Sequence, residues 1–152
     1  MPPPHDVLFF EDLELGRLYR CGTTGVTAED IRRFAQEFDP QPFHLDAVAA
    51  RETIFGELVA SGWQTSSLTM SMAVKGELNL AGGWIGLSID SIRWPIAVRP
   101  GDQLTAVTEV LESRPSKTKP QYGVIKVRTR TLNQRDELVC EIVSNQLVER
   151  RG

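Results

Sequence analysis

The sequence predicts an α+β fold in which an antiparallel sheet wraps around one long central helix. Residues 58–74 contain no charged side chain, so a helix at about residues 62–74 would have to be enclosed by other structure. The chain that follows is rich in β-branched residues and is divided by turn sequences, as is typical of strands. The 152 residues fit one domain, expected at residues 8–150 after a proline-rich, disordered or extended tail at residues 1–7.

A strand and a helix are expected before the uncharged stretch. Residues 18–25 have the composition of a strand. Thr27, with Asp30 three residues later, is typical of a helix N-terminus. Apolar residues then recur at helical spacing on one face: Ile31, Phe34, Ala35 and Phe38. This helix is expected to end at Asp39.

Two prolines restrict the backbone after this helix. Pro40 and Pro42 disfavour regular helix, so residues 39–43 are expected to form a fixed, irregular loop. Asp39 and His44 stand at its two ends, five residues apart. Their side chains can therefore face one site.

The remaining elements are predicted from caps, turns and alternation. A short helix is expected at residues 46–52, with Asp46 as its cap. Turns are expected at residues 100–102 and 133–136. They separate strands predicted at residues 86–94, 103–113, 122–133 and 137–149.

Composition and charge exclude several classes of function. The net charge of -3 and the pI of about 5.4 do not favour nucleic-acid binding. Two cysteines far apart and two histidines form no cluster at metal-ligand spacing, so no metal is expected. Residues 58–74 barely reach membrane-spanning length and are rich in Ser and Thr, which favours a buried helix. The N-terminus lacks the features of a secretory signal, so a cytoplasmic location with reduced thiols is expected.

Asp39 and His44 are the candidate catalytic residues. Addition of water to a double bond needs one group that takes a proton from water and another that supplies one. A carboxylate and an imidazole facing one site can share these tasks. The alternative is structural, with Asp39 capping a turn and His44 buried with its hydrogen bonds satisfied.

These residues also resemble a known family. Asp-Pro-Gln-Pro-Phe-His at residues 39–44, followed by Ala-Ser-Gly-Trp at residues 60–63, resembles the MaoC-like dehydratases, the (R)-specific enoyl-CoA hydratase family. The resemblance continues through residues 93–102 and 114–134, and covers roughly residues 8–149. It implies a hot-dog fold, which agrees with the fold predicted above. It also implies reversible hydration of a trans-2-enoyl-CoA, or of an enoyl carrier protein, to a (3R)-hydroxyacyl thioester, with coenzyme A as part of the substrate and no separate cofactor.

Roles for five residues follow from the resemblance and from their places in the predicted elements. The resemblance makes Asp39 and His44 the catalytic pair. A serine of the central helix often supports this pair, and Ser67 aligns with it, although close helix–sheet packing explains Ser67 equally well. The backbone N–H of Gly62, at the helix start, can stabilise negative charge on a thioester carbonyl. Trp63 is a candidate substrate contact, with core packing as the favoured alternative.

Contacts with the carrier and with a second subunit complete the expectations. Arg114 and Lys117 lie on a basic, proline-marked loop and could meet coenzyme A phosphates from the same or a partner subunit; a plain solvated loop is the alternative. Exposed strand edges and the family resemblance indicate a homodimer or a higher oligomer built from dimers. The competing functions are a hot-dog acyl-CoA thioesterase and a non-catalytic acyl-thioester-binding protein. Gln41 replaces an asparagine of the better-known hydratases, which bears on substrate choice.

Overall fold

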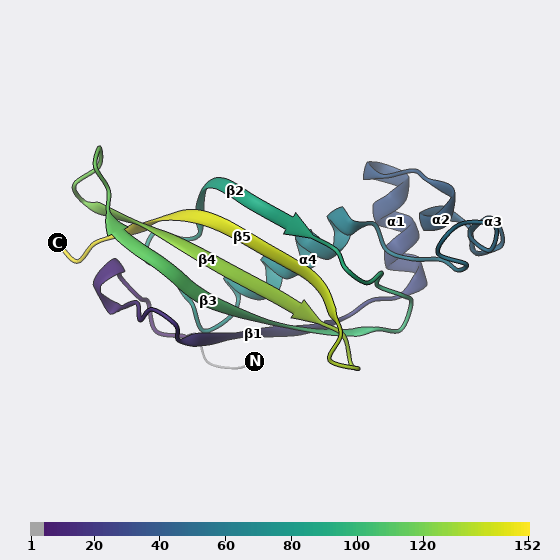
Figure 1. Ribbon diagram of the computed structural model, residues 1–152, viewed down its shortest axis with the longest axis horizontal. Coiled ribbons are helices and arrows are strands. Elements are labelled where there is room, and N and C mark those ends of the chain that lie inside the picture. Colours follow the sequence, from purple (N-terminus) through teal and green to yellow (C-terminus); the bar gives the residue numbers. More distant parts are fainter. Residues whose placement is uncertain (1–4) are drawn as a thin grey trace.

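The computed structural model describes residues 5–152, and within them a five-stranded antiparallel sheet forms the body of the molecule (Figure 1). Its strands follow the order β1-β3-β4-β5-β2, so β1 and β2 are the two edges. Each neighbouring pair is antiparallel. The strand bounds are β1 Leu18–Gly25, β2 Ile85–Arg93, β3 Gln103–Pro115, β4 Tyr122–Leu132 and β5 Leu138–Glu149. All five strands were predicted, with small shifts at their ends.

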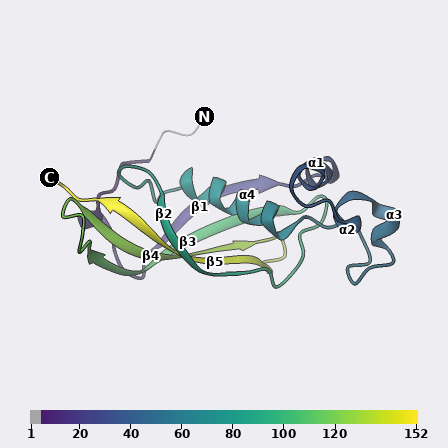
Figure 2. The same cartoon turned by 90° about the horizontal axis from the view of Figure 1, so that it is seen from above.

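The long helix α4, Gly62–Val74, lies along one face of this sheet (Figure 2). Ser61 caps it by accepting a hydrogen bond from the Trp63 N–H. The helix packs onto the sheet through Thr65, Thr69, Met72 and Ala73, which are buried. A sheet wrapped around a central helix is the hot-dog arrangement, so the predicted fold is confirmed.

Two clusters of apolar side chains fill the space between the sheet and the helices. The first joins β1, β3 and the N-terminal helices to α4; its buried members include Val26, Ile31, Met72 and Leu104. The second lies toward the other end of the sheet, with Tyr19, Val110, Ile125 and Val148 among its buried members. Alternation along β3 and β4 sends one side chain in two to this core and the others to the outer face.

In a single chain, α4 is not enclosed on every side as was predicted. Trp63, Ser67, Met70 and Val74, spaced by about one helical turn, form an exposed stripe. Beside them, the edge strand β2 exposes Ile85, Leu87 and Ile89. We call these seven residues the α4–β2 face. A contiguous apolar surface of this kind indicates a binding surface rather than a solvated one.

Three short elements gather at one end of the sheet: α1 Ala28–Phe38, α2 Pro42–Leu45 and α3 Ala47–Ala50 (Figures 1 and 2). The helix predicted after Thr27 is confirmed as α1. The irregular loop predicted at residues 39–43 is partly wrong, because Pro42 begins α2. Proline fits the first helical position, where its missing N–H would have had no intrahelical acceptor. The helix capped by Asp46 is present as α3 but ends earlier than predicted.

Replacing Thr27 by Ala should destabilise the protein by about 1 kcal/mol. The Thr27 hydroxyl accepts from the Asp30 N–H at 3.1 Å, while the Asp30 carboxylate accepts from the Thr27 N–H. The substitution removes the first of these bonds and leaves a donor of α1 unpaired. Urea unfolding should show a lower midpoint for Thr27→Ala than for Thr27→Ser, which keeps the hydroxyl. Equal midpoints for the two variants would show that the cap does not stabilise α1.

The N-terminal tail is described only in part. Residues 1–4 of the predicted tail lie outside the described residues. Residues 5–7 are exposed and have no regular structure, and at Leu8 the chain joins Leu80 through a β-bridge. Across residues 5–152, no helix combines the length and the apolar character needed to cross a membrane.

Candidate active site

The local backbone brings Asp39 and His44 together. Asp39 ends α1, and its N–H donates to the Ala35 carbonyl at 2.9 Å. His44 lies in α2 and is buried. The segment before α4 pairs with α2, because the Val59 N–H donates to the Phe43 carbonyl at 3.0 Å. Backbone hydrogen bonds therefore fix the positions from which the side chains of Asp39 and His44 project.

The two side chains are in direct contact. His44 Nε2 lies 3.3 Å from Asp39 Oδ2. The other ring nitrogen, Nδ1, lies 2.7 Å from the Val59 carbonyl oxygen. A carbonyl only accepts hydrogen bonds, so Nδ1 must carry a proton. Nε2 is therefore the atom that can gain or lose a proton, and it faces the carboxylate.

Two further side chains hold the Asp39 carboxylate. The Ser61 hydroxyl donates to Oδ2 at 2.7 Å, and the Gln41 amide donates to Oδ1 at 2.5 Å. Partial burial raises the pKa of Asp39, but the hydrogen bonds from Ser61 and Gln41 and the charge of His44 together lower the pKa below that of an ordinary aspartate. Asp39 is therefore ionised at neutral pH and can accept a proton.

A cavity of about 260 Å³ lies against this pair. Its lining includes His44 and Gly62, together with Thr65, Trp94 and mostly apolar neighbours. Gly62 is the first residue of α4, and N–H groups of a first helical turn have no acceptor within the helix. Asp39 is not part of this lining, and its Oδ2 contacts Nε2 of His44, which is.

The serine that contacts Asp39 is Ser61 rather than Ser67. Ser67 donates to the Trp63 carbonyl within α4 at 2.8 Å. It lines a different hollow, a groove between α4, β2 and β5. Ser61 stands directly before Gly62, a position where serine is favoured as a helix cap. That cap signal could have identified Ser61, whereas its bond to Asp39 depends on the folding of α1 against α4.

Trp94 lines the cavity, and the ring of its neighbour Trp63 lies outside that lining. Trp63 is 56% exposed, so core packing does not describe it in a single chain. Its ring meets that of Trp94 edge-on, with centroids 5.3 Å apart. A Cβ atom on Gly62 would lie 2.6 Å from the Trp94 ring, so only glycine allows this ring to pack against the start of α4. Sequence reasoning missed Trp94, since nothing in the strand pattern places it near Asp39 and His44, the pair called the dyad below.

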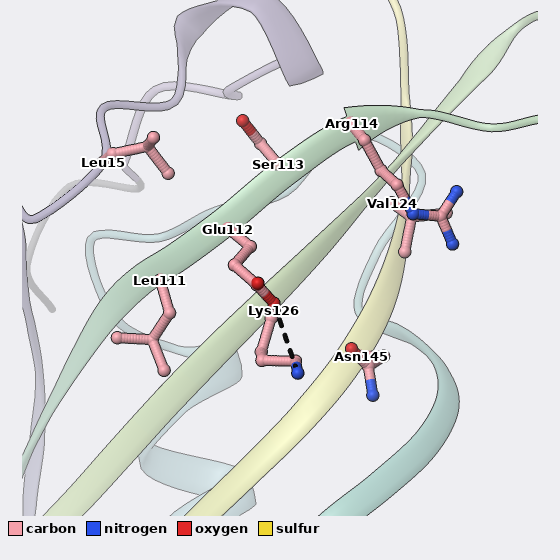
Figure 3. Close-up of a pocket in the computed structure, with 8 residues that line it drawn as sticks. All are labelled: Leu15, Leu111, Glu112, Ser113, Arg114, Val124, Lys126 and Asn145. Atoms are coloured by element: carbon pink, nitrogen blue, oxygen red, sulfur yellow. Dashed lines mark ion pairs between the residues drawn. The ribbon is translucent and has the colours of Figure 1, made fainter.

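Arg114 and Lys117 lie away from this site within one chain. Arg114 lines a hollow of about 610 Å³ over the sheet, near an ion pair of 3.2 Å between Lys126 and Glu112 (Figure 3). Lys117 belongs to the β3–β4 connection, at the end of the sheet opposite α1, α2 and α3 (Figure 1). Contact of either residue with substrate phosphates, from a partner subunit, stays a prediction.

Comparison with known proteins identifies the family. Residues 16–132 match the MaoC-like domain. The chain belongs to the MaoC-like domain family. The structure also superposes on the MaoC-like dehydratase of Rhodospirillum rubrum with a TM-score of 0.91, at 45% identity over 95% of this chain and 99% of that one.

Two relatives of this MaoC-like protein have named activities. The 3-hydroxybutyryl-CoA dehydratase of Methylorubrum extorquens is 32% identical over 124 residues, which are 81% of this chain and 76% of that protein. The (R)-hydratase PhaJ1 of Pseudomonas aeruginosa superposes with a TM-score of 0.75, at 26% identity over 94% of this chain and 86% of that one. The family therefore includes hydratases and dehydratases.

Replacing Ser61 by Ala should shift the pH dependence of this MaoC-like protein. Ser61 is one of the groups that lower the pKa of Asp39, so its removal should raise that pKa. Asp39 would then become protonated at a higher pH. As the pH is lowered, activity should therefore start to fall at a higher pH than in the wild type. The acidic limb of kcat/KM measures this shift.

Ser67→Ala is the matched control for Ser61→Ala. It also removes a hydroxyl from the α4 region, but one bonded to Trp63 rather than to Asp39. The acidic limb of Ser67→Ala should coincide with that of the wild type.

Because the Ser61 hydroxyl caps α4, Ser61→Ala should also lower the free energy of unfolding by about 1 kcal/mol. An unchanged acidic limb in Ser61→Ala would show that the hydroxyl does not act on Asp39.

Proposed function

We propose that this protein is an acyl-thioester hydratase/dehydratase. It adds water reversibly to a trans-2-enoyl-CoA, or to an enoyl carrier protein, and gives a (3R)-hydroxyacyl thioester. The observation that carries this proposal is the contact of 3.3 Å between His44 Nε2 and Asp39 Oδ2, beside a cavity lined by His44 and Gly62. The named hydratase and dehydratase relatives support the same reaction class.

The reaction divides between the side chains of the dyad and the start of α4. Asp39, as a carboxylate, takes a proton from water, and the water oxygen forms a bond to C3. Electrons of the double bond move toward the thioester oxygen, where the Gly62 N–H stabilises the negative charge. The proton that Asp39 took from water is then delivered to C2, with His44 Nε2 sharing in the transfer, so both side chains return to their starting protonation states. One proton and one hydroxide have been added to the double bond, and the thioester is intact.

Gln41 and Ser61 act as positioning residues in this scheme. They occupy separate oxygens of Asp39, so the carboxylate cannot rotate freely. The Val59 carbonyl fixes the tautomer of His44 in the same way. Such support holds the reacting groups in one geometry before substrate binds.

The test is product analysis with a panel of trans-2-enoyl-CoA thioesters. A hydratase yields 3-hydroxyacyl-CoA with the R configuration and no free thiol. Release of free coenzyme A as the first product would indicate the thioesterase alternative. Saturable binding without turnover across the panel would indicate a non-catalytic acyl-thioester-binding protein.

We further propose that the protein functions as a homodimer in the cytoplasm and needs no cofactor other than the coenzyme A of its substrate. The α4–β2 face leaves five large apolar side chains at least 41% exposed: Trp63, Met70, Val74, Leu87 and Ile89. It includes the edge strand β2, whose outer backbone groups can pair with another chain. Sedimentation at micromolar concentration tests the assembly, and a monomer would contradict it.

A further inference from the structure

The cavity of about 260 Å³ beside the dyad offers few side chains that can hold a water molecule. Among the lining residues that the structure describes, only His44, Thr65 and Trp94 have a polar side chain. An indole N–H donates but cannot accept, and that of Trp94 is already bonded to the Ser66 hydroxyl at 3.0 Å. A water molecule in this cavity therefore finds two side-chain acceptors in the lining, the His44 ring and the Thr65 hydroxyl.

Thr65 lies in the first turn of α4, three residues after Gly62, and residues three apart share one face of a helix. Both residues therefore meet the cavity from the same side. Only 2% of the Thr65 surface is exposed. Helical side chains lean toward the N-terminus, so the Thr65 hydroxyl lies over the start of α4, near the Ser61 carbonyl. Thr65 thus places a buried hydroxyl beside the helix start that carries the Gly62 N–H.

The protein holds the Thr65 hydroxyl only loosely. Its one bond within residues 5–152 is the bond that it donates to the Ser61 carbonyl, at 3.4 Å. The equivalent bonds of Ser67 and Thr69, each to the carbonyl four residues earlier, measure 2.8 Å. Ordinary O–H···O bonds measure about 2.5 to 3.0 Å, so the Thr65 bond is weak. Both lone pairs of this buried oxygen are free to accept, and a buried polar atom needs a partner.

We propose that Thr65 positions the attacking water. Its hydroxyl oxygen accepts one hydrogen of that water while the dyad takes the other, which directs a lone pair of the water oxygen at C3. Thr65 keeps its own proton throughout, so the proton balance of the reaction is unchanged. In the product, the same hydroxyl contacts the oxygen on C3. The inference rests on the proposed function, since it concerns the nucleophile of that reaction.

Thr65→Val removes the hydroxyl and keeps the branched shape of the side chain. With a trans-2-enoyl-CoA as substrate, kcat should fall by about 10- to 100-fold with little change in KM, because the acyl group binds as before but the water is not oriented. Thr65→Ser keeps an acceptor and should recover most of the rate. Thr69→Val is the matched control, since Thr69 lies one turn further along α4 and its hydroxyl is bonded to that of Thr131. The control should lower stability and leave kcat unchanged.

Ligand binding tests the contact between Thr65 and the C3 oxygen without turnover. Two ligands are compared in the Asp39→Asn background, which slows dehydration: a (3R)-hydroxyacyl-CoA and the saturated acyl-CoA that lacks its hydroxyl. Adding Thr65→Val removes one hydrogen bond to the first ligand and none to the second. Affinity for the (3R)-hydroxyacyl-CoA should therefore fall by about three- to tenfold, while affinity for the saturated acyl-CoA should stay the same.

The two experiments separate this inference from the proposed function. Equal weakening of both ligands, or turnover of Thr65→Val like that of the wild type, would overturn the role of Thr65 and leave the hydratase reaction standing. A wild type without hydratase activity would overturn the proposed function. In that protein, weaker binding of the (3R)-hydroxyacyl-CoA alone would still support the contact of Thr65 with the C3 oxygen.

Discussion

Replacing Asp39 by Asn should reduce hydration of a good trans-2-enoyl thioester by a factor of about 10² to 10⁴. The amide keeps the shape of the side chain and can still accept the hydrogen bond from Ser61, but it cannot take a proton from water. Folding and substrate binding should therefore persist. Steady-state rates, with substrate affinity measured separately, distinguish lost chemistry from lost binding.

His44→Ala should cause a loss of similar size, and the two losses should not add. If one step needs both groups, the double variant should be scarcely slower than the slower single variant. Asp46→Asn is the matched control, because Asp46 caps α3 in the same segment without contacting the dyad. Turnover like that of the wild type in Asp39→Asn or His44→Ala would exclude the proposed chemistry.

The largest effect on stability is expected for Leu104→Ala. Leu104 is fully buried and belongs to the core cluster that also holds Val26, Ile31 and Met72. Truncation leaves a cavity that this rigid neighbourhood can only partly fill, at a cost of about 2 to 5 kcal/mol. That is a large part of the roughly 5 to 15 kcal/mol by which a typical domain is stable.

Urea unfolding measures the loss in Leu104→Ala. Leu15→Ala is the control, since Leu15 is 61% exposed and its truncation should change stability by less than about 0.5 kcal/mol. A midpoint for Leu104→Ala equal to that of Leu15→Ala would show that this cluster does not dominate the stability of the fold.

Much of the fold could be predicted because its signals are local. Alternation and turn sequences located the strands, and the uncharged stretch located α4. One error is local: Pro42 was read as excluding helix, yet proline fits the first position of α2. The other error concerns interactions that are not local. The exposed stripe of α4 could not be predicted. A stretch without charges indicates that a helix is covered, but not whether the sheet or a second chain covers each of its faces.

The candidate site could be predicted only in part, for the same reason. The prolines indicated that Asp39 and His44 share a site, and the structure brings them into contact. The support for this pair comes from Ser61 and the Val59 carbonyl, 22 and 15 residues away along the chain from their partners. No spacing rule connects these positions. The contact depends on how the segment before α4 packs against α2.

The most direct test of the central claim is to follow oxygen from ¹⁸O-labelled water during one turnover of a trans-2-enoyl-CoA. Mass spectrometry should find the label in the hydroxyl group at C3 of an intact (3R)-hydroxyacyl-CoA, and Asp39→Asn should form almost none of this product in the same time. Label found instead in the carboxylate of a released fatty acid, with free coenzyme A, would contradict the account.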